Sequence, residues 1–189
     1  PVMDEERYRA AGFSDLLADA ALALKTLRRQ PEADPGKTLR LGHSEGARIA
    51  AFLALQERTL AGLILIGTPV RSMQEVIHYQ HVDWGCRFMK EFDANGDGAL
   101  SRQELEPYPG LEVKFEEWDL DRDGRIDLEK ELRPLMTSRY YIPELQKFQK
   151  TKLGKELLAQ PPLFQLLAKI PVPLALLHGE EDRYTDPAD

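Results

Sequence analysis

Apolar side chains recur at intervals of three and four residues near the start of the chain, which is the spacing of one face of an α-helix. The positions that share this spacing are Phe13, Leu16, Leu17, Ala20, Ala21, Leu24 and Leu27. Ser14 is a candidate N-cap, and Pro31 marks the end of the segment. The pattern predicts an amphipathic helix of about four turns.

Short apolar runs follow, and helix-forming residues lie between the first two of them. The runs are Thr38–Leu41, Leu63–Ile66 and Val172–Leu177, and the intervening Ala47–Leu55 is rich in alanine and leucine. The unbroken apolar character of Leu63–Ile66 is typical of a strand that is covered on both faces. This alternation predicts an α/β fold, with helices on both faces of a parallel sheet.

Residues 72 to 169 interrupt this pattern with acidic loops and then with helical segments around 145–148, 153–158 and 163–167. The chain has 25 basic and 32 acidic residues and a formal net charge of −7. Residues 91–131 alone hold 14 acidic and five basic residues. Because no basic stripe is present to meet phosphates, we expect no nucleic acid partner.

The remaining composition excludes several classes of protein. The apolar content of 42% and the charged content of 30% are ordinary for a folded globular chain. No apolar run approaches the roughly 20 residues that cross a bilayer, so we expect no membrane span. The single Cys86 cannot form a disulfide within the chain, and no motif around it indicates a catalytic thiol. The start at Pro1, without a leader, indicates an excerpt of a longer protein and leaves the compartment unknown.

The pentapeptide Gly42-His43-Ser44-Glu45-Gly46 lies between a predicted strand and a predicted helix. This context matches the nucleophile elbow, in which a serine occupies the tip of a strained turn. The turn needs small residues two positions before and two after the serine, and the amide of Glu45 can face an oxyanion there. A glycine-flanked surface turn is the alternative interpretation.

On these residues the chain resembles the α/β-hydrolase family, in particular its bacterial esterase-like members. The resemblance covers residues 11–75 and 169–187. It implies that Ser44 is the nucleophile, that the backbone amide of Glu45 is an oxyanion-hole donor, and that Asp182 is the triad acid. Asp186 is the alternative acid, and an ordinary turn is the alternative role of Asp182.

A catalytic histidine follows the acid in that family, but no histidine follows His178 here. An elbow would aim His43 away from the serine oxygen, and we interpret His78 and His81 as solvated or packed residues. We therefore expect this chain alone to be inactive and its parent to supply the histidine.

Residues 93–104 place oxygen ligands at the spacing of a calcium loop. The ligand positions are Asp93, Asn95, Asp97, the carbonyl of Ala99, Ser101 and Glu104. Gly98 stands at the sixth position, where the turn is sharp. A flexible cage of about six to eight oxygens favours Ca²⁺ over Mg²⁺, so we predict calcium.

Residues 119–130 repeat the pattern with one defect. The ligand positions are Asp119, Asp121, Asp123, the carbonyl of Arg125 and Asp127, around Gly124. Position 12 is Lys130, which brings no oxygen and places a cation where a carboxylate belongs. Glu129 and Glu131 are expected to be out of register. We therefore predict weaker occupancy, with direct binding by Asp127 as partial compensation.

Both loops resemble the EF-hand family over about residues 84–135. Leu100 and Ile126 are expected to face each other in a short strand pair between the loops. The expected shared core consists of Phe88, Phe92, Leu105, Phe115, Trp118 and Leu132.

The combined interpretation is a hydrolase core interrupted by a calcium-binding insertion. Its expected parts are the first core segment 1–75, the EF-hand pair 76–136, the cap helices 137–168 and the second core segment 169–189. The parent is expected to be a serine hydrolase that acts on a small acyl or ester substrate, with calcium as a structural staple more than as a gate. The alternative is a non-catalytic calcium-binding or regulatory protein on a hydrolase scaffold.

Overall fold

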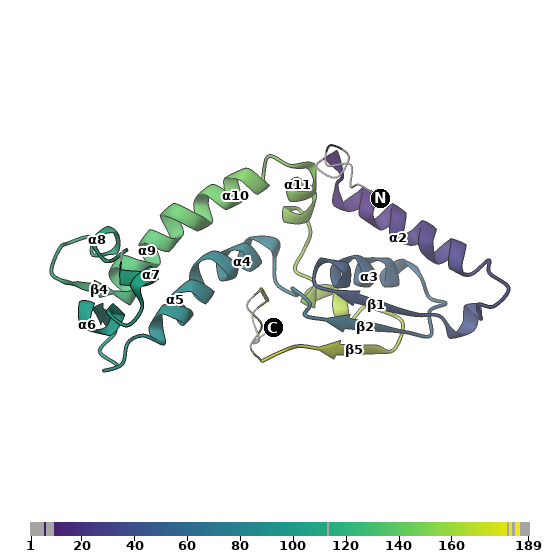
Figure 1. Cartoon of the computed structure of the whole chain (residues 1–189). Helices are drawn as coiled ribbons and strands as arrows, with labels where there is room; N and C mark the ends of the chain where they lie inside the picture. The colour runs from purple at the N-terminus through teal and green to yellow at the C-terminus, as the bar shows by residue number, and fades with distance from the viewer. Residues whose placement is uncertain (1–5, 7–9, 113, 181, 183, 186–189) are drawn as a thin grey trace. The chain divides into compact units, whose positions relative to one another are not determined.

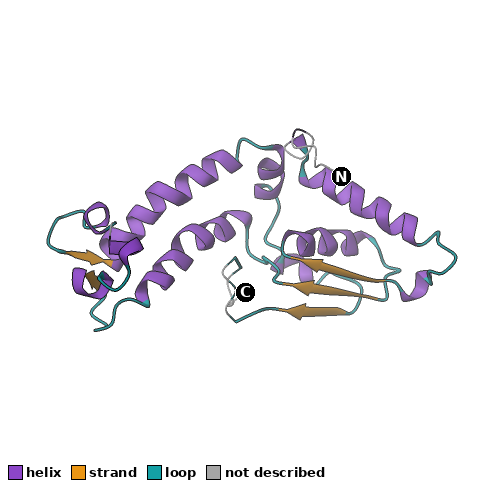
Figure 2. Ribbon diagram, viewed as in Figure 1, coloured by secondary structure: helices purple, strands orange, loops and turns teal. Residues whose placement is uncertain are grey.

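The computed structural model describes residue 6, residues 10–112, 114–180, 182, and residues 184 and 185. It is a mixed α/β structure (Figures 1 and 2). The chain divides into two compact units. The first comprises residues 1–76 with 147–189, and the second comprises residues 77–146.

The first unit is built on a parallel sheet with the strand order β1-β2-β5. The strands are β1 (Leu39–His43), β2 (Gly62–Ile66) and β5 (Leu174–Leu177). Leu41 of β1 pairs with Ile64 of β2, which pairs in turn with Ala175 of β5. The predicted α/β class and parallel pairing are confirmed.

Helices cover one face of this sheet in the described residues. Helix α3 (Glu45–Gln56) packs on β1 and β2, and α2 (Phe13–Leu27) packs on α3 (Figure 1). On the other face Leu39 and Leu41 are 58% and 62% exposed. The prediction of helices on both faces is therefore wrong for this part of the chain.

Helix α2 begins one residue earlier than its predicted cap. Gly12 precedes it, and the amide of Gly12 donates to the carboxylate of Asp15. The predicted N-cap Ser14 lies within the first turn, where its amide and hydroxyl both donate to Glu156. Glu156, which is distant in the sequence, thus accepts the hydrogen bond from a free amide of the first turn that a local cap residue would have accepted.

Short helical elements complete the first unit. They are η1 (Pro35–Lys37), α11 (Lys152–Leu158) and α12 (Phe164–Leu167). Helices α4 (Met73–His78) and α10 (Ile142–Phe148) run across the boundaries between the units. None of the described helices combines the length and apolar character that a membrane span requires.

The second unit consists of short helices around an antiparallel strand pair. The helices are α5 (Trp84–Lys90), α6 (Arg102–Leu105), α7 (Pro109–Glu112), α8 (Phe115–Trp118) and α9 (Arg133–Met136). The strands are β3 (Ala99–Ser101) and β4 (Arg125–Asp127). The π-helical turns are η2 (Tyr79–Asp83), η3 (Leu128–Leu132) and η4 (Thr137–Tyr141).

The core of this unit joins both acidic loops. Leu100 pairs with Ile126 across β3 and β4, and both are fully buried, as predicted. The predicted core residues Leu105, Phe115, Trp118 and Leu132 are buried, and Phe92 packs against them.

Phe88 was expected in this core but is 40% exposed, so that prediction is wrong. Met89, the next residue of α5, is buried in its place. The Phe88 ring instead packs edge-to-face on Phe92, with 5.2 Å between ring centroids. The helix is thus rotated by one residue relative to the face that the sequence suggested.

Candidate functional site

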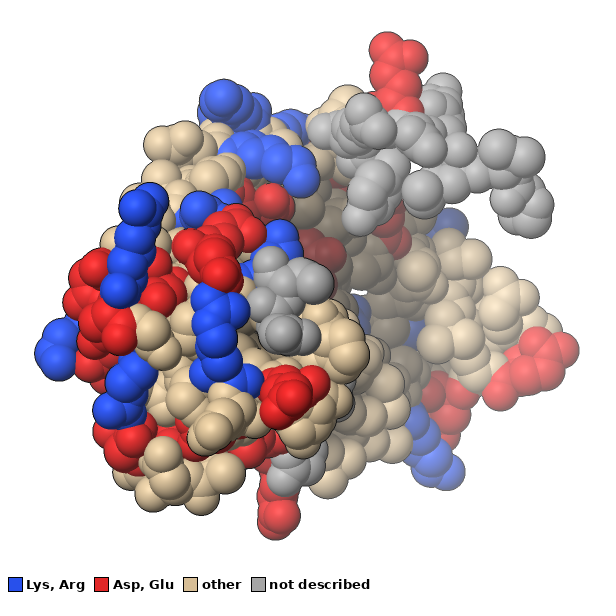
Figure 3. Space-filling model, turned by 60° about the vertical axis from the view of Figure 1, so that its left-hand side comes forward, with Lys and Arg blue, Asp and Glu red and all other residues tan. Residues whose placement is uncertain are grey.

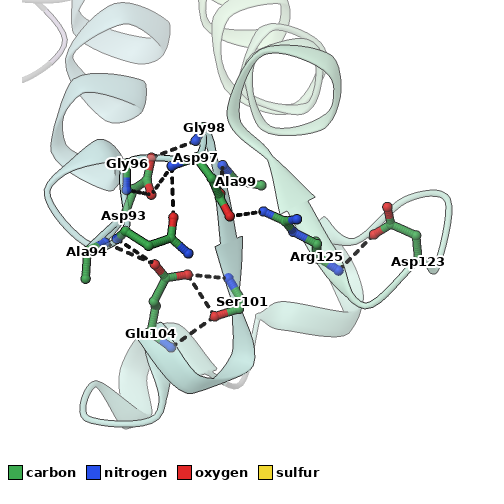
Figure 4. A network of polar contacts seen from close by, with 11 residues as sticks. Asp93, Ala94, Gly96, Asp97, Gly98, Ala99, Ser101, Glu104, Asp123 and Arg125 are labelled. Atoms are coloured by element: carbon green, nitrogen blue, oxygen red, sulfur yellow. Dashed lines mark hydrogen bonds and ion pairs between the residues drawn. The ribbon is translucent and has the colours of Figure 1, made fainter.

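The side chains of the first acidic loop are held by amides of the same loop (Figure 4). Asp93 accepts from the amides of Gly96 and Asp97 through Oδ1, and from the amide of Gly98 through Oδ2. Gly96 and Gly98 have φ values of +73° and +84°, which favour glycine because a Cβ is strained there.

The carboxylate of Glu104 connects the beginning and the end of this loop. Its Oε1 accepts from the amides of Ala94 at 3.0 Å and Asn95 at 3.4 Å. Its Oε2 accepts from the amide and the hydroxyl of Ser101, both at 2.8 Å. The Ser101 amide and these other donors outweigh the effect of burial and lower the pKa of Glu104. The last ligand position therefore presents an ionised carboxylate to the loop.

A cross-loop ion pair joins Arg125 of β4 to the carboxylate of Asp97 (Figure 4). The pKa of Asp97 is lowered by the amide of Ala99 and further by Arg125. On the face turned forward in Figure 3, other Lys and Arg side chains also lie among the acidic ones. Lys114 of the same unit lies 3.0 Å from Glu117. Basic side chains thus offset part of the acidic charge of this unit.

The second loop converges on a common point. One carboxylate oxygen from each of Asp119, Asp121 and Asp123 lies within 4.8 Å of the other two. Oxygens that bind one Ca²⁺ at about 2.3–2.6 Å can lie at such separations. Asp119 is 9% exposed, and its Oδ1 is buried without a hydrogen-bond partner. Because an unpaired buried carboxylate oxygen is costly, this donor set fits a divalent cation.

Lys130 directs its charge at the ninth position of the loop. Its ammonium lies 2.9 Å from Asp127 Oδ2, and its side chain is 85% exposed. Asp127 Oδ1 accepts from the amides of Glu129 and Lys130. The hydrogen bond from the Lys130 side chain, with these amides, lowers the pKa of Asp127 to about 2. The pKa of Lys130 is raised first by Asp127 and also by Asp121 and Asp123, so its positive charge acts on the ligand carboxylates. Both the repulsion of a cation by Lys130 and direct ligation by Asp127 stay predictions.

A comparison with family models identifies these loops. The EF-hand family matches residues 88–106 and 113–129. The EF-hand resemblance is confirmed over these segments. EF hands bind Ca²⁺, so calcium is the cofactor of this unit. The second match ends one residue before Lys130.

Two further comparisons add little about the first unit. A search of the curated proteins finds no match. A similar solved structure comes from work on carboxylesterases of the ammonia-oxidizing thaumarchaeon Nitrososphaera gargenis, with 17% identity and a TM-score of 0.32. The alignment covers 90% of this chain and 64% of that one, so this chain spans less than two thirds of its length.

The serine turn of the first unit has an unusual backbone. Ser44 lies between β1 and α3 with φ +55° and ψ −122°, and its side chain is exposed. A Cβ on Gly42 would overlap the carbonyl oxygen of Gly46 and lie 2.6 Å from Ala47 Cα. Glycine is therefore required at position 42. A Cβ on Gly46 would meet nothing within 4 Å, so the predicted need for space at position 46 is wrong.

The carboxyl ends of the parallel strands bring the other candidates to the same edge. Gly67 follows β2, and a Cβ there would lie 3.2 Å from Asp182 Oδ2 and 3.7 Å from His43 Nε2. Ser44 follows the neighbouring β1, and the described residues donate no hydrogen bond to its Oγ. The alternative acid Asp186 lies outside the described residues.

Asp182 is already engaged by its neighbours. It accepts from the Thr185 hydroxyl at 2.7 Å and from the Tyr184 amide at 2.8 Å, and it lies 3.6 Å from His178 Nε2. Burial alone would raise the pKa of Asp182, but these hydrogen bonds and His178 together lower it. The carboxylate is thus kept ionised, as a partner for a histidine requires.

A cavity of about 310 Å³ adjoins the serine turn. It is lined by Leu16, Glu45, Ile49, Phe148, Thr151 and Leu153. Burial raises the pKa of Glu45, whose amide opens α3. The first amides of a helix have no partner within it, so this end of α3 can stabilise negative charge.

Two residues have structural roles that the sequence left undecided or missed. His78 lies 2.8 Å from Asp83 Oδ2, and its ring packs on Tyr141, so it is a packed residue. Arg48 of α3 is fully buried and donates to the carbonyl oxygens of Pro69 and Arg71. These hydrogen bonds hold the segment after β2 against α3. Nothing in the sequence indicated that an arginine on this alanine-rich helix would be buried.

Proposed function

We propose that the chain supplies the nucleophile and the acid of a serine hydrolase that acts on carboxylic esters and carries a calcium-binding EF-hand unit. The observation that carries the proposal is the backbone of Ser44. A non-glycine residue at φ +55° is strained, and such strain concentrates at functional sites. The position between a parallel strand and a helix is that of a nucleophile elbow.

The proposed reaction begins when Ser44 Oγ attacks the acyl carbon and its proton passes to a histidine outside this chain. The amide of Glu45 and the N-terminus of α3 stabilise the oxyanion. The histidine returns the proton to the leaving alcohol, and water then releases the acid from the serine. Asp182 orients that histidine.

The cavity beside Glu45 supports an apolar acyl group as the substrate. Leu16, Ile49 and Leu153 give it apolar walls, while Thr151 and Glu45 add polar groups. A volume of about 310 Å³ suits a small ester, since small-molecule sites begin at roughly that size.

One observation favours the non-catalytic alternative, a calcium-binding protein on a hydrolase scaffold. Among the described residues Ser44 Oγ has no base, and Asp182 is held by Thr185 and His178. A serine without its base keeps little activity.

Labelling with a fluorophosphonate tests the proposal, because this probe reacts with an activated serine. We expect the natural protein that contains this chain to be labelled at Ser44, and Ser44→Ala to abolish labelling. Ser14→Ala, which changes another exposed serine, is the matched control. Asp182→Asn is expected to slow labelling by about a thousandfold or more. No labelling of folded natural protein would establish the non-catalytic alternative.

A further inference from the structure

Glu131 lies one residue beyond the ligand positions of the second loop, yet its carboxylate is turned into that loop. Its side chain is 94% buried, since the residue is 6% exposed. Its Oε1 accepts from the amides of Leu120 at 2.7 Å and Asp121 at 3.1 Å. Its Oε2 accepts from the amide of Asp127 at 2.8 Å. These amides belong to loop positions 2, 3 and 9.

Glu104 makes the same set of contacts in the first loop. Its carboxylate accepts from the amides of Ala94, Asn95 and Ser101, which are also loop positions 2, 3 and 9. Glu104 stands at position 12 and Glu131 at position 13. The two carboxylates thus occupy equivalent places in the structure although they are out of register in the sequence.

The π-helical turn η3 explains how position 13 reaches this place. The amide of Arg133 donates to the carbonyl of Leu128, five residues earlier. A π-helical turn contains more residues than an α-helical turn. A side chain that points in a given direction therefore comes later in the sequence. The exit helix α6 of the first loop is α-helical and needs no such shift. The expectation that Glu131 is out of register is therefore wrong.

A second observation points to a ligand at this loop. Asp119 has a buried Oδ1 without a partner, and its other oxygen accepts from the amide of Gly124. Its carboxylate is grouped with those of Asp121 and Asp123. Lys130 pairs with Asp127 at the rim of the loop. The buried carboxylates of Asp119 and Glu131 have no basic partner among the described residues.

We propose that Glu131 is the two-oxygen calcium ligand of the second loop and replaces the missing glutamate at Lys130. The inference rests on the EF-hand assignment and is independent of the role of Ser44. The site then has four carboxylates, from Asp119, Asp121, Asp123 and Glu131. The first loop has carboxylates from Asp93, Asp97 and Glu104 only. The second loop therefore presents one more carboxylate ligand than the first.

Calcium titration of the full chain, followed by amide NMR, tests this assignment loop by loop. The amides of Gly98 and Gly124 donate to the first ligand of their own loops, so each reports one site. In the wild type both signals shift, and calorimetry counts two calcium ions per chain. In Glu131→Gln the Gly124 response needs roughly 100-fold more calcium. The Gly98 response stays within about threefold of the wild type.

Two matched variants serve as controls. Glu104→Gln produces the reciprocal result and leaves the Gly124 response in place. Glu129→Gln changes an exposed neighbour of Glu131 that pairs with Arg133, and it leaves both responses unchanged. An unshifted Gly124 in the wild type, or an equal response in Glu131→Gln, overturns the proposal.

Circular dichroism shows whether Glu131→Gln folds. If it does not, a crystal structure of the wild type with calcium decides the question. Both Glu131 oxygens on an ion in the second loop support the proposal. An ion without Glu131, or no ion in that loop, contradicts it.

Discussion

The two calcium loops share one internal framework and differ in how they end. In both, the first ligand accepts from the glycine amide at position 6, and the glycine has a positive φ, +84° at Gly98 and +89° at Gly124. In both, a buried or half-buried glutamate accepts from amides at positions 2, 3 and 9. The first loop reaches that glutamate through an α-helical turn and the second through a π-helical turn.

This difference shows that a calcium loop is completed by the position of its last carboxylate in space, and that the count of residues along the sequence does not fix this position. Counting to position 12 assumes an α-helical exit, and Lys130 then makes the second loop defective. The π-helical turn moves Lys130 outward to Asp127 and brings Glu131 inward. Two loops with unequal sequences thus present comparable donor sets.

The largest test of this equivalence is stabilisation by calcium. At about 1,000 times Kd, each occupied loop is expected to add about 4 kcal/mol to the free energy of unfolding. Thermal unfolding with calcium and with a chelator measures this gain. Glu104→Gln and Glu131→Gln each weaken one loop roughly 100-fold, so each is expected to remove about a third of the gain. A full gain in Glu131→Gln would show that Glu131 does not contribute to calcium binding.

The strand pair offers the next test, because it couples the loops mechanically. Leu100→Ala and Ile126→Ala each remove a fully buried side chain and are expected to cost about 2–5 kcal/mol in chemical denaturation. Ile126→Val, which removes a single methyl group, is expected to cost about 0.5–1.5 kcal/mol. Unequal costs for the two alanine variants would contradict the symmetry of the pair.

A smaller effect is expected at Arg125, which belongs to the second loop but pairs with a ligand of the first. Arg125→Gln frees the carboxylate of Asp97 for calcium. Because exposed ion pairs are worth about 0.2–1 kcal/mol, the first loop is expected to bind about 1.5- to 5-fold more tightly. The Gly98 amide measures this change. Weaker binding in the variant would mean that Arg125 orients Asp97 instead of competing for it.

The smallest effect concerns the ion pair of Lys130 with Asp127. The pKa of Asp127 is lowered from its ordinary 3.8 to about 2, first by Lys130. A lowered acid contributes stability above its unfolded pKa, so this helix cap is lost as the pH falls from about 4 to about 2. Lys130→Ala is expected to raise the Asp127 pKa toward 3.8. Carbon NMR of its carboxyl group measures the titration, and an unchanged pKa would assign the shift to the backbone amides alone.

Residue types alone predicted much of the framework. The spacing of Asp and Gly indicated both loops, and the Leu100–Ile126 pair followed from position 8 of each. The apolar runs predicted the parallel strands, although their boundaries shifted by one or two residues. The exposed face of the sheet at Leu41 was not predicted, because a continuous apolar run does not indicate which faces of a strand are covered.

The serine turn was likewise predicted only in part. Its glycine pattern predicted a strained turn, and the need for glycine at position 42 follows from the nearby backbone of α3. The open space at Gly46 could not be foreseen, since it depends on how α3 leaves the sheet. Arg48 is a similar case, because only packing shows that it is buried.

The sequence by itself determined which groups can bind calcium, since carboxylates and glycines at fixed spacing have that chemistry wherever the loop lies. Tertiary structure alone decided which glutamate closes the second loop. The burial of Leu128, Leu132 and Leu135 in the shared core fixes the phase of the exit helix. Tertiary structure also decided that Arg125 meets Asp97, because the pairing of β3 with β4 sets that contact. Helix phase and strand pairing depend on long-range packing, which local residue patterns do not encode.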